Sequence, residues 1–598
     1  MENLSIGYGR PHQDGAVLDL FTTWAHRTPD APALIDGART HSYAELDRLA
    51  DAVADELRDR VRPGDLVGVC LGHSAALAAV TLATAKLGAV HLPLGPRPGE
   101  RRLQAVAEQL RPACLVGDPA LLPAGEHRTL DLDLGDTPVA VALVPGEQVQ
   151  VPAGTHYAVL TSGSTGTPKA VAVGEPALGA LLQWYRELAG LGPGERHSLL
   201  IGVAFDPHVM ELWATLTSGA ALVVAPEAVR WDSGALADWW REAGITAAIL
   251  PTPLAEPLLA RPWPQGLALR HLTVGGDRLR RGPGPDVTAT VHNAYGPAEA
   301  TVTTTVHTMA PGGDHGTGAP PIGLPIPGAV VLVTDPDGRP VPRGEAGELR
   351  IGGRGLAAGY LDPELTARRF VGVPAGVEGV DRLYRSGDRV VMRADGVLEF
   401  HGRLDDQVKV SGVRIEPAEV EAAFERDGRV HRAVVAAATS AGVTRLLAYV
   451  QTAAGSPAGG AEDLLAAVRP WLPEQAVPSA VRIVDAYPLD ANGKVDRAAL
   501  LALEEERAAA APDTEDGDTP TERTVLRLCR ELIGRADLGP ADNFLAAGGN
   551  SLAAARLLEA LEAEYGVRLR APLVLRQPDL RAVARLVEER RPTAATTA

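Results

Sequence analysis

Residues 65–95 read DLVGVCLGHS, AALAAVTLATAKLG and AVHLPLG in succession, and this stretch decides the fold class. A short apolar run is followed by fourteen mostly small, helix-forming residues and then by a second apolar run. Strands that alternate with helices in this way favour parallel pairing, because a parallel neighbour needs a long crossover connection. The same alternation returns at residues 197–226, where HSLLIGVAF, HVMELWATLTSG and AALVVAP follow one another. We therefore expect an α/β fold with a largely parallel sheet.

Composition limits the class of protein. The chain has 598 residues, too many for one hydrophobic core, and a formal net charge of -18, which argues against nucleic-acid binding. Cys70, Cys114 and Cys529 are widely scattered and fit neither a disulfide framework nor a zinc site. No secretory signal is visible at the start of the sequence, and no apolar run is long enough to span a membrane. These features favour a cytoplasmic protein without a membrane partner.

The composition changes along the chain and indicates several parts. An acidic, proline-containing stretch near residue 515 lacks aromatic residues and is typical of a linker. Beyond it, TERTVLRLCRELIG and LAAARLLEALEAEYG place apolar residues at helical spacing. The expected parts are a large α/β lobe at 1–402, a small α+β lobe at 403–505, a linker at 506–521, a small helical unit at 522–591 and a disordered tail at 592–598.

Residues 161–169 read TSGSTGTPK and suggest a site for an anionic ligand. Glycine admits unusual backbone angles, while hydroxyl and backbone N–H groups donate hydrogen bonds to phosphate oxygens. The stretch does not match the GxxxxGK[ST] pattern of P-loop proteins, because no glycine precedes Lys169 and Ala170 follows it. A serine- and glycine-rich surface turn is the alternative interpretation of this loop when it is taken alone.

Further motifs follow in a fixed order: NAYGPAE at 293–299, GEL at 347–349, YRSGD at 384–388, GRLDDQVK at 402–409 and NGKVDR at 492–497. Together with 161–169, the set resembles the adenylation domains of nonribosomal peptide synthetases, within a superfamily that also holds acyl-CoA ligases and luciferases. The resemblance extends from about Tyr43 to Arg497. Residues 542–552, DNFLAAGGNSL, resemble the phosphopantetheine attachment motif of peptidyl carrier proteins, with Ser551 as the attachment residue.

The resemblance implies a fold and a reaction. The fold would be a large adenylate-forming lobe of layered sheets and helices, a small α+β lobe and an all-α four-helix carrier bundle. In the reaction an amino-acid carboxylate attacks the α-phosphorus of ATP, and the aminoacyl adenylate then passes to the thiol of 4'-phosphopantetheine on Ser551. Lys494 would be the catalytic lysine, and Asp405 the hinge between the lobes.

The resemblance also implies residues around the nucleotide. The 161–169 loop would close over the phosphates, Asn293 would meet the adenine edge and Tyr295 would stack near it, while Asp388, with Arg403 close by, would accept bonds from the ribose. Glu299 would bind Mg²⁺, for which a hard carboxylate oxygen is suited. The full set is Thr161, Ser162, Gly163, Ser164, Thr165, Gly166, Lys169, Gly275, Gly276, Asn293, Ala294, Tyr295, Gly296, Asp388, Arg403 and Glu299.

The substrate pocket follows from the same motifs. Asp206 matches the aspartate that binds the α-ammonium group of an amino acid, which favours an amino acid over an aryl acid. Apart from Asp206 and Lys494, the lining carries no charge, so a charged side chain would be buried without a partner. The lining is Asp206, Pro207, Met210, Ile249, Thr273, Gly275, Ala294, Val302, Thr303 and Lys494. It is similar to pockets that accept tyrosine and, less closely, tryptophan. We therefore expect tyrosine or a para-substituted phenylalanine as the substrate; a hydrophobic aliphatic substrate is the alternative.

The sequence contains neither an HHxxxDG condensation motif nor a GxSxG elbow. We therefore expect a free-standing loading didomain of a natural-product pathway. Its expected partners are a phosphopantetheinyl transferase, a tailoring enzyme or a downstream condensation domain, and an MbtH-like activator. Two alternatives stay open. The first is an acyl- or aryl-CoA ligase, and the presence of Asp206 and Ser551 argues against it. The second is an inactive carrier scaffold, and the presence of Lys494, Asp388 and Glu299 argues against it.

Overall fold

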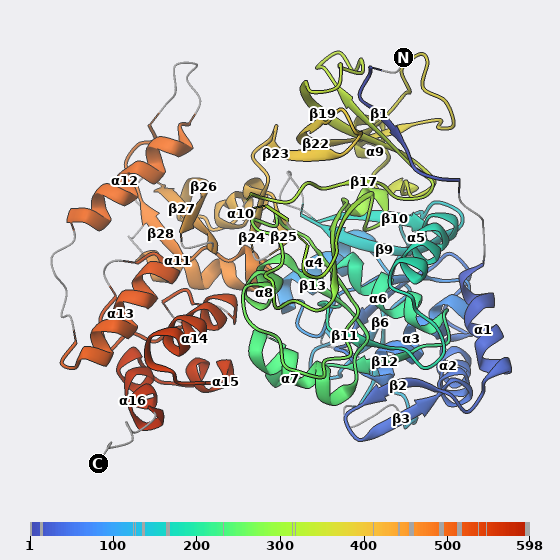
Figure 1. The fold of residues 1–598 in the computed structure, drawn as a ribbon, viewed down its shortest axis with the longest axis horizontal. Helices are drawn as coiled ribbons and strands as arrows, with labels where there is room; N and C mark the ends of the chain where they lie inside the picture. The colour runs from blue at the N-terminus through green and yellow to red at the C-terminus, as the bar shows by residue number, and fades with distance from the viewer. Residues whose placement is uncertain are drawn as a thin grey trace. The chain divides into compact units, whose positions relative to one another are not determined.

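The structure is a computed structural model, and it divides into two compact units (Figure 1). The first unit holds most of the chain up to Asp406, and the second holds the chain from Gln407 onward together with earlier short segments such as Glu227–Leu236. The described residues are 3–11, 16–123, 125, 127–133, 138–162, 168–230, 232–313, 315–316, 318–410, 412–440, 443–453, 460–488, 495–510, 517–535, 538–545, 547–549 and 551–591.

A nine-stranded sheet in the first unit confirms the expected parallel pairing. Its order is β17-β16-β15-β14-β13-β11-β12-β2-β3, and the strands from β15 to β2 run parallel, with antiparallel strands at both edges. The strands are β2 (Pro32–Asp36), β3 (Arg39–Ser42), β11 (Arg196–Leu199), β12 (Ala221–Val224), β13 (Ala247–Pro251), β14 (His271–Gly275), β15 (Thr290–Tyr295), β16 (Thr305–Met309) and β17 (Leu324–Pro325).

The stretch at residues 65–95 forms the centre of an eight-stranded sheet. β4 (Leu66–Cys70) and β5 (Val90–Pro93) pair in parallel and are joined by α3 (Ala75–Lys86), as predicted. Residues 75–84 of α3 are buried on every side of the helix, and this explains why the helix is built almost entirely from small residues. The other strands are β6 (Cys114–Gly117), β7 (His127–Thr129), β8 (Ala140–Leu143), β9 (Thr155–Thr161), β10 (Lys169–Gly174) and β20 (Gly359–Tyr360).

One hydrophobic core joins both of these sheets to the helices that pack on them. It contains residues of α1 (Val17–Arg27), α2 (Tyr43–Leu57), α3, α5 (Glu175–Leu188) and α6 (Asp206–Leu216). Ser42 caps α2 through a capping box with Glu45, which satisfies backbone donors at the start of that helix. The layered arrangement of sheets and helices was predicted.

A third sheet of six strands is antiparallel and was not anticipated by the alternating pattern. Its path is β1-β18-β19-β22-β21, with β23 paired to β22. The strands are β1 (Ile6–Tyr8), β18 (Ala329–Thr334), β19 (Ala346–Gly353), β21 (Phe370–Val371), β22 (Leu383–Met392) and β23 (Leu398–Arg403). The first strand pairs with one more than 300 residues later, and local sequence patterns carry no information about such a partner.

The second unit contains a small α+β part with its own core. α10 (Pro417–Glu425) packs on a sheet in which β26 (Val430–Ser440), β27 (Val443–Thr452) and β28 (Ala480–Ile483) lie in that order. α12 (Arg497–Ala510) extends past the predicted start of the linker at residue 506. Its sequence is rich in alanine, leucine and glutamate, the strongest helix formers, and this accounts for the longer helix.

Four helices at the C-terminal end form the expected carrier bundle, drawn in red in Figure 1. They are α13 (Pro520–Ile533), α14 (Ser551–Tyr565), α15 (Ala571–Leu575) and α16 (Leu580–Arg590). α13 begins with a Thr519 cap and ends at Gly534, whose positive φ of 70° suits a helix C-terminus. The predicted tail at 592–598 lies outside the described residues.

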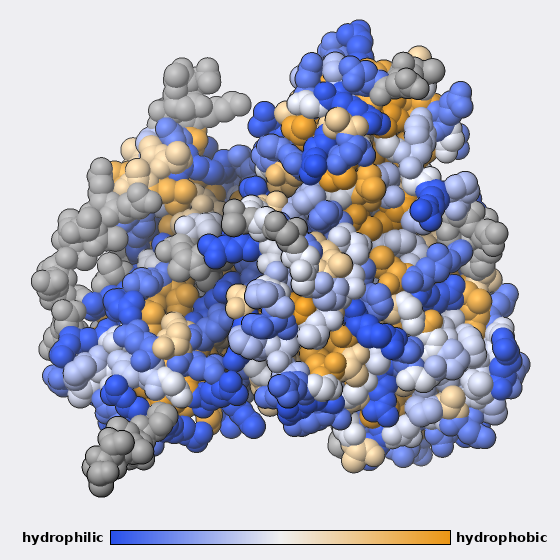
Figure 2. Space-filling view, viewed as in Figure 1, coloured by the Kyte–Doolittle hydropathy of each residue, from blue (hydrophilic) through white to orange (hydrophobic). Residues whose placement is uncertain are grey.

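The visible surface is mostly hydrophilic (Figure 2), and the cysteines form no disulfide, as the composition indicated. Figure 2 shows mostly hydrophilic residues on the visible face, with hydrophobic ones in small groups. The three cysteines are buried and free, and burial raises the pKa of each thiol to about 12. Among the described residues, no helix combines the length and apolarity required to cross a membrane.

Candidate active site

The predicted pocket residues gather at the carboxyl edge of the nine-stranded sheet. β13, β14 and β15 end at Pro251, Gly275 and Tyr295, and β11 leads through a short loop into α6 at Asp206. Because these strands are parallel neighbours, their carboxyl ends lie along one edge, where open α/β sheets bind ligands. The fold therefore brings together residues that are up to about ninety positions apart in the sequence.

Strand register puts four of the pocket residues on one face of the sheet. Ile249 is paired with Thr273, and Gly275 and Ala294 follow with the period of two that returns a side chain to the same face. A Cβ atom on Gly275 would come within 2.9 Å of the Ala294 carbonyl oxygen. Glycine is therefore required here, because no side chain fits between these two strands.

The Thr273 hydroxyl is a buried polar group at this face. Thr273 is 1% exposed, and its Oγ1 makes no hydrogen bond of acceptable geometry to any described residue. The hydroxyl of Tyr185 on α5 lies nearby: burial raises the pKa of Tyr185, and the Thr273 side chain lowers it in part. Tyr185 in turn hydrogen-bonds to His197 at 2.8 Å. A polar group of a ligand could bind to Thr273 at little desolvation cost.

Asp206 opens α6, and Met210 lies one turn further along the helix, where it is buried. Pro207 occupies the first turn, where a missing N–H costs nothing. The loop before the helix is fixed by Glu211, whose carboxylate accepts hydrogen bonds from the backbone N–H groups of Leu200 and Ile201, each at 3.0 Å. Sequence reasoning missed Glu211, since its partners are backbone groups without a sequence signal.

The segment after β15 is strained. Val302 has a φ of 66° and follows Thr301 with a φ of 52°, and such values are uncommon for β-branched residues. Gly296 permits this turn, because a Cβ atom there would lie 2.5 Å from the Val302 carbonyl oxygen and 2.7 Å from the Thr304 nitrogen. Thr303 is buried beside them. The strained pair therefore includes one residue of the predicted pocket lining, Val302.

The predicted adenine and ribose residues lie close to one another. Asn293 is buried, and its Nδ2 donates to the Pro321 carbonyl oxygen at 2.8 Å; among the described residues no hydrogen bond reaches its Oδ1. The Tyr295 hydroxyl donates to Asp388, and Phe400 packs on the Tyr295 ring at 6.4 Å. Burial, followed by the charge of Asp388, raises the pKa of Tyr295 well above its usual value.

Arg403 connects the predicted ribose carboxylate to the predicted hinge. Its Nη1 lies 2.6 Å from Asp388, and its Nε and Nη2 form a fork to Asp405 at 2.6 and 2.8 Å. Nη2 also donates to the Ser386 carbonyl oxygen at 3.1 Å. A planar guanidinium can make such a double contact, and a lysine ammonium cannot. The first compact unit extends to Asp406, a few residues past the predicted boundary at 402.

Glu299, the predicted magnesium ligand, is 1% exposed and accepts a hydrogen bond from the Tyr360 hydroxyl at 2.5 Å. Tyr360 was not among the predicted site residues, since it is 61 positions away in sequence. An oriented carboxylate oxygen fits a hard divalent cation, so the donor set is compatible with Mg²⁺. A metal ion held here would neutralise phosphate charge.

The phosphate loop is described only at its two ends. Thr161 ends β9 and pairs with Lys169 at the start of β10, so the loop spans a β-hairpin. Gly276 follows β14 with a φ of 87°. Gly163, Ser164, Thr165, Gly166 and Lys494 lie outside the described residues, and Ser162 lies at their margin. Ser551 is the first residue of α14, as predicted for an attachment site at a helix N-terminus.

Comparison with known proteins gives two family matches. The family described as AMP-binding enzyme matches residues 21–361, and the family described as phosphopantetheine attachment site matches residues 523–587. The first match covers more than half of the chain and includes the phosphate loop, the pocket strands and Glu299. The second covers the helical bundle with Ser551.

Several curated proteins and solved structures are similar to this chain. Novobiocin biosynthesis protein H of Streptomyces niveus is 35% identical over 602 residues, with 96% of each chain covered. Phosphinothricin tripeptide synthetase PhsC of Streptomyces viridochromogenes is 36% identical over 584 residues, which are 95% of this chain and 52% of that protein. A linear gramicidin synthase protein of Brevibacillus parabrevis is 36% identical over 560 residues, which are 92% of this chain but only 7% of that protein. The chain thus spans a small part of several curated relatives.

The structure of holo-PA1221, an NRPS protein containing adenylation and PCP domains bound to a vinylsulfonamide inhibitor, is 28% identical, with a TM-score of 0.75 and 97% of both chains covered. The chain belongs to the AMP-binding enzyme family, as an ATP-dependent ligase of the nonribosomal peptide synthetase type that joins an adenylation domain to a phosphopantetheine carrier domain.

Proposed function

We propose that the protein activates an L-amino acid with ATP and loads it onto its own carrier domain. The observation that carries this proposal is the position of Asp206 at the start of α6, at the sheet edge where Ile249, Thr273 and Gly275 also lie. A carboxylate at this place can pair with the α-ammonium group of an amino acid, which an aryl or fatty acid lacks.

In the first half-reaction the amino-acid carboxylate attacks the α-phosphorus of ATP and pyrophosphate leaves. Asp206 binds the ammonium group and Asp388 orients the ribose, while Glu299 would hold Mg²⁺, which would neutralise phosphate charge. Lys494 contacts the carboxylate and the forming acyl phosphate; it lies outside the described residues, and this role remains a prediction. We expect Lys494→Ala to lower adenylation by about 100-fold or more.

In the second half-reaction the thiol of 4'-phosphopantetheine attacks the adenylate, forming a thioester and releasing AMP. The arm is attached to Ser551 by a separate phosphopantetheinyl transferase. Ser551→Ala should therefore abolish covalent loading and leave amino-acid-dependent pyrophosphate exchange intact. Loss of exchange in this variant would argue against the proposal that the two half-reactions are separable.

We infer that the substrate is tyrosine or a para-substituted phenylalanine. Gly275 and Ala294 leave depth for a ring, and the buried Thr273 hydroxyl offers a partner for a polar group at its far end. Thr273→Val removes the hydroxyl with little change in volume. It should lower the preference for tyrosine over phenylalanine by about tenfold, the cost of one buried hydrogen bond.

ATP–pyrophosphate exchange across the twenty amino acids, with fatty and aryl acids included, tests the proposal. Exchange with tyrosine and none with aryl acids is expected, and Asp206→Asn should abolish it. Asp337→Asn, an exposed carboxylate remote from the site, is the matched control. Exchange with an aryl acid in the absence of any amino acid would favour a CoA-ligase-like function; no exchange, with or without an MbtH-like activator, would favour a carrier scaffold.

The loaded amino acid would then pass to another protein of the same pathway. The proposed acceptor is a tailoring enzyme or a downstream condensation domain, which would dock on the carrier bundle. Mass spectrometry of the phosphopantetheine-bearing protein, incubated with ATP and an amino-acid mixture, would report the loaded residue and its attachment site together.

A further inference from the structure

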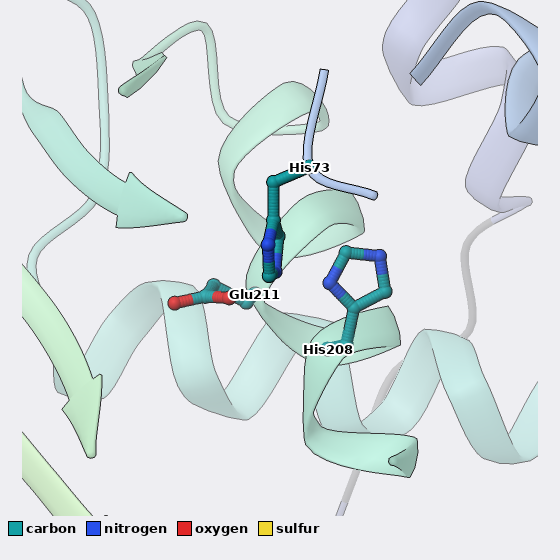
Figure 3. A group of neighbouring side chains, drawn as sticks. All are labelled: His73, His208 and Glu211. Carbon is teal, nitrogen blue, oxygen red and sulfur yellow. The ribbon is translucent and has the colours of Figure 1, made fainter. Parts of the chain in front are cut away.

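A cluster of two histidines and a glutamate lies on and beside α6, the helix that begins at Asp206, and takes no part in the proposed chemistry (Figure 3). It consists of His73, His208 and Glu211. One nitrogen or oxygen atom from each residue lies within 4.8 Å of the corresponding atoms of the other two. His208 is 1% exposed and Glu211 is 0% exposed, while His73 is partly exposed and leaves a route for a small ion.

The fold brings these side chains together from two elements. His208 and Glu211 are three positions apart on α6, so they share one face of the helix and lie on successive turns. His73 precedes Ser74, the N-cap of α3, and reaches the same place from the loop after β4. The three residues span about 140 positions in the sequence, so no local motif predicts the cluster.

Backbone groups hold two of the three side chains in place. The Nε2 of His73 lies 2.6 Å from the Ile201 carbonyl oxygen. Because a carbonyl oxygen only accepts, this nitrogen carries the proton, and the lone pair of the neutral ring is on Nδ1. Metal-binding histidines commonly donate their other ring N–H to a backbone carbonyl in this way. Glu211 is fixed by the N–H groups of Leu200 and Ile201.

We propose that His73, His208 and Glu211 form a site for a divalent transition-metal ion, with Zn²⁺ as the ion that fits best. Two imidazoles and one carboxylate are a known zinc donor set, and zinc accepts them at about 2.0–2.2 Å with a fourth position left for water. Ligand atoms around a tetrahedral zinc are then roughly 3.4 Å apart. From separations of at most 4.8 Å, the ligand atoms have to approach one another by up to about 1.4 Å.

The bound ion would brace the start of α6 rather than take part in catalysis. It would tie the turn that follows Asp206 to the loop before α3, and through Glu211 to the loop after β11. Glu299, the proposed magnesium ligand, is not among the three residues of the cluster. The competing explanation is a metal-free packing cluster, for which the edge-to-face contact of the two histidine rings at 5.5 Å would be sufficient.

Zinc content of the full-length protein distinguishes these explanations without any substrate. The protein is stripped with a chelator, incubated with Zn²⁺, freed of loose metal by gel filtration and measured by plasma mass spectrometry. About one zinc per chain is expected, together with a rise of a few degrees in the melting temperature. Less than about 0.1 zinc per chain with no change in melting temperature would overturn the proposal.

The variants His73→Gln and His208→Gln should each lower the retained zinc at least tenfold. His26→Gln, at an exposed position on α1, is the control and should retain zinc as the wild type does. Zinc content unchanged in the His73→Gln His208→Gln protein would also contradict the site. Should that protein fail to fold, X-ray absorption of the zinc-loaded wild type decides: nitrogen and oxygen ligands with imidazole scattering support the site, and sulfur ligands overturn it.

Discussion

The hydrogen bond from Tyr360 to Glu299 gives the sharpest prediction about catalysis. The two oxygens are 2.5 Å apart, and the residues are 5% and 1% exposed, so water does not compete for the carboxylate. A hydrogen bond to a charged group contributes about 1.5–3 kcal/mol. Since 1.4 kcal/mol corresponds to a factor of ten, Tyr360→Phe should lower kcat/KM for adenylation by about 10- to 150-fold if Glu299 must be held in place to bind Mg²⁺.

Pyrophosphate exchange measured over a range of Mg²⁺ concentrations tests this expectation. The loss should be largest at low Mg²⁺, because an unoriented carboxylate binds the ion more weakly. Tyr43→Phe is the control: it removes another buried hydroxyl, which donates to the Ala220 carbonyl oxygen at 2.8 Å in the helical layer. It should lower the melting temperature and leave the Mg²⁺ dependence unchanged. Equal activity of Tyr360→Phe and wild type at limiting Mg²⁺ would refute the reasoning.

Three more predictions follow from the contacts described. Gly296→Ala should lower exchange activity by at least tenfold, as measured with saturating ATP, because its Cβ would collide with backbone atoms 2.5–2.8 Å away; unchanged activity would contradict the close approach. Arg403→Lys should weaken ATP binding in calorimetry by about tenfold, since an ammonium cannot form the fork; wild-type affinity would contradict an orienting role. Burial, chiefly, lowers the pKa of His91 and His292 to about 3, so the folded state binds fewer protons than the unfolded state below pH 6.5. As the pH falls from 6.5 towards that pKa, the free energy of unfolding should decrease by roughly 1.4 kcal/mol per histidine for each pH unit. A free energy of unfolding, measured with urea, that stays constant from pH 6.5 to 5 would contradict this.

The sequence was sufficient for the α/β core because local patterns encode it. The stretch at residues 65–95 forms β4, α3 and β5 as predicted, and the apolar spacing of the last eighty residues gives the four carrier helices. The six-stranded antiparallel sheet could not be predicted in the same way, because β1 pairs with β18 across most of the large lobe. The helix α12 replaced part of the predicted linker, since helix propensity outweighed acidic composition.

In the candidate site, too, some residues could be predicted from the sequence and others could not. Motif spacing predicted Asp206, Asn293, Glu299 and Asp388 as site residues, and all four lie in one compact unit. Their supporting contacts were not predictable, since Tyr360 and Glu211 act through distant or backbone partners that have no pattern in the sequence. The left-handed backbone conformation of Val302 could not be predicted either, because β-branched residues such as valine rarely adopt a positive φ.

The contacts of Arg403 with Asp405 and Asp388 have a consequence for building hybrid enzymes by exchanging lobes. The guanidinium of Arg403 binds one carboxylate on β22 and another after β23. Residues 388–405 should therefore come from the same parent enzyme. A crossover point between residues 388 and 403 would take Asp388 from one parent and Arg403 from the other, so the two charges would no longer lie in the surroundings in which they evolved. A junction between Asp406 and Gln407, where the first compact unit ends, would keep all three charges with their native surroundings.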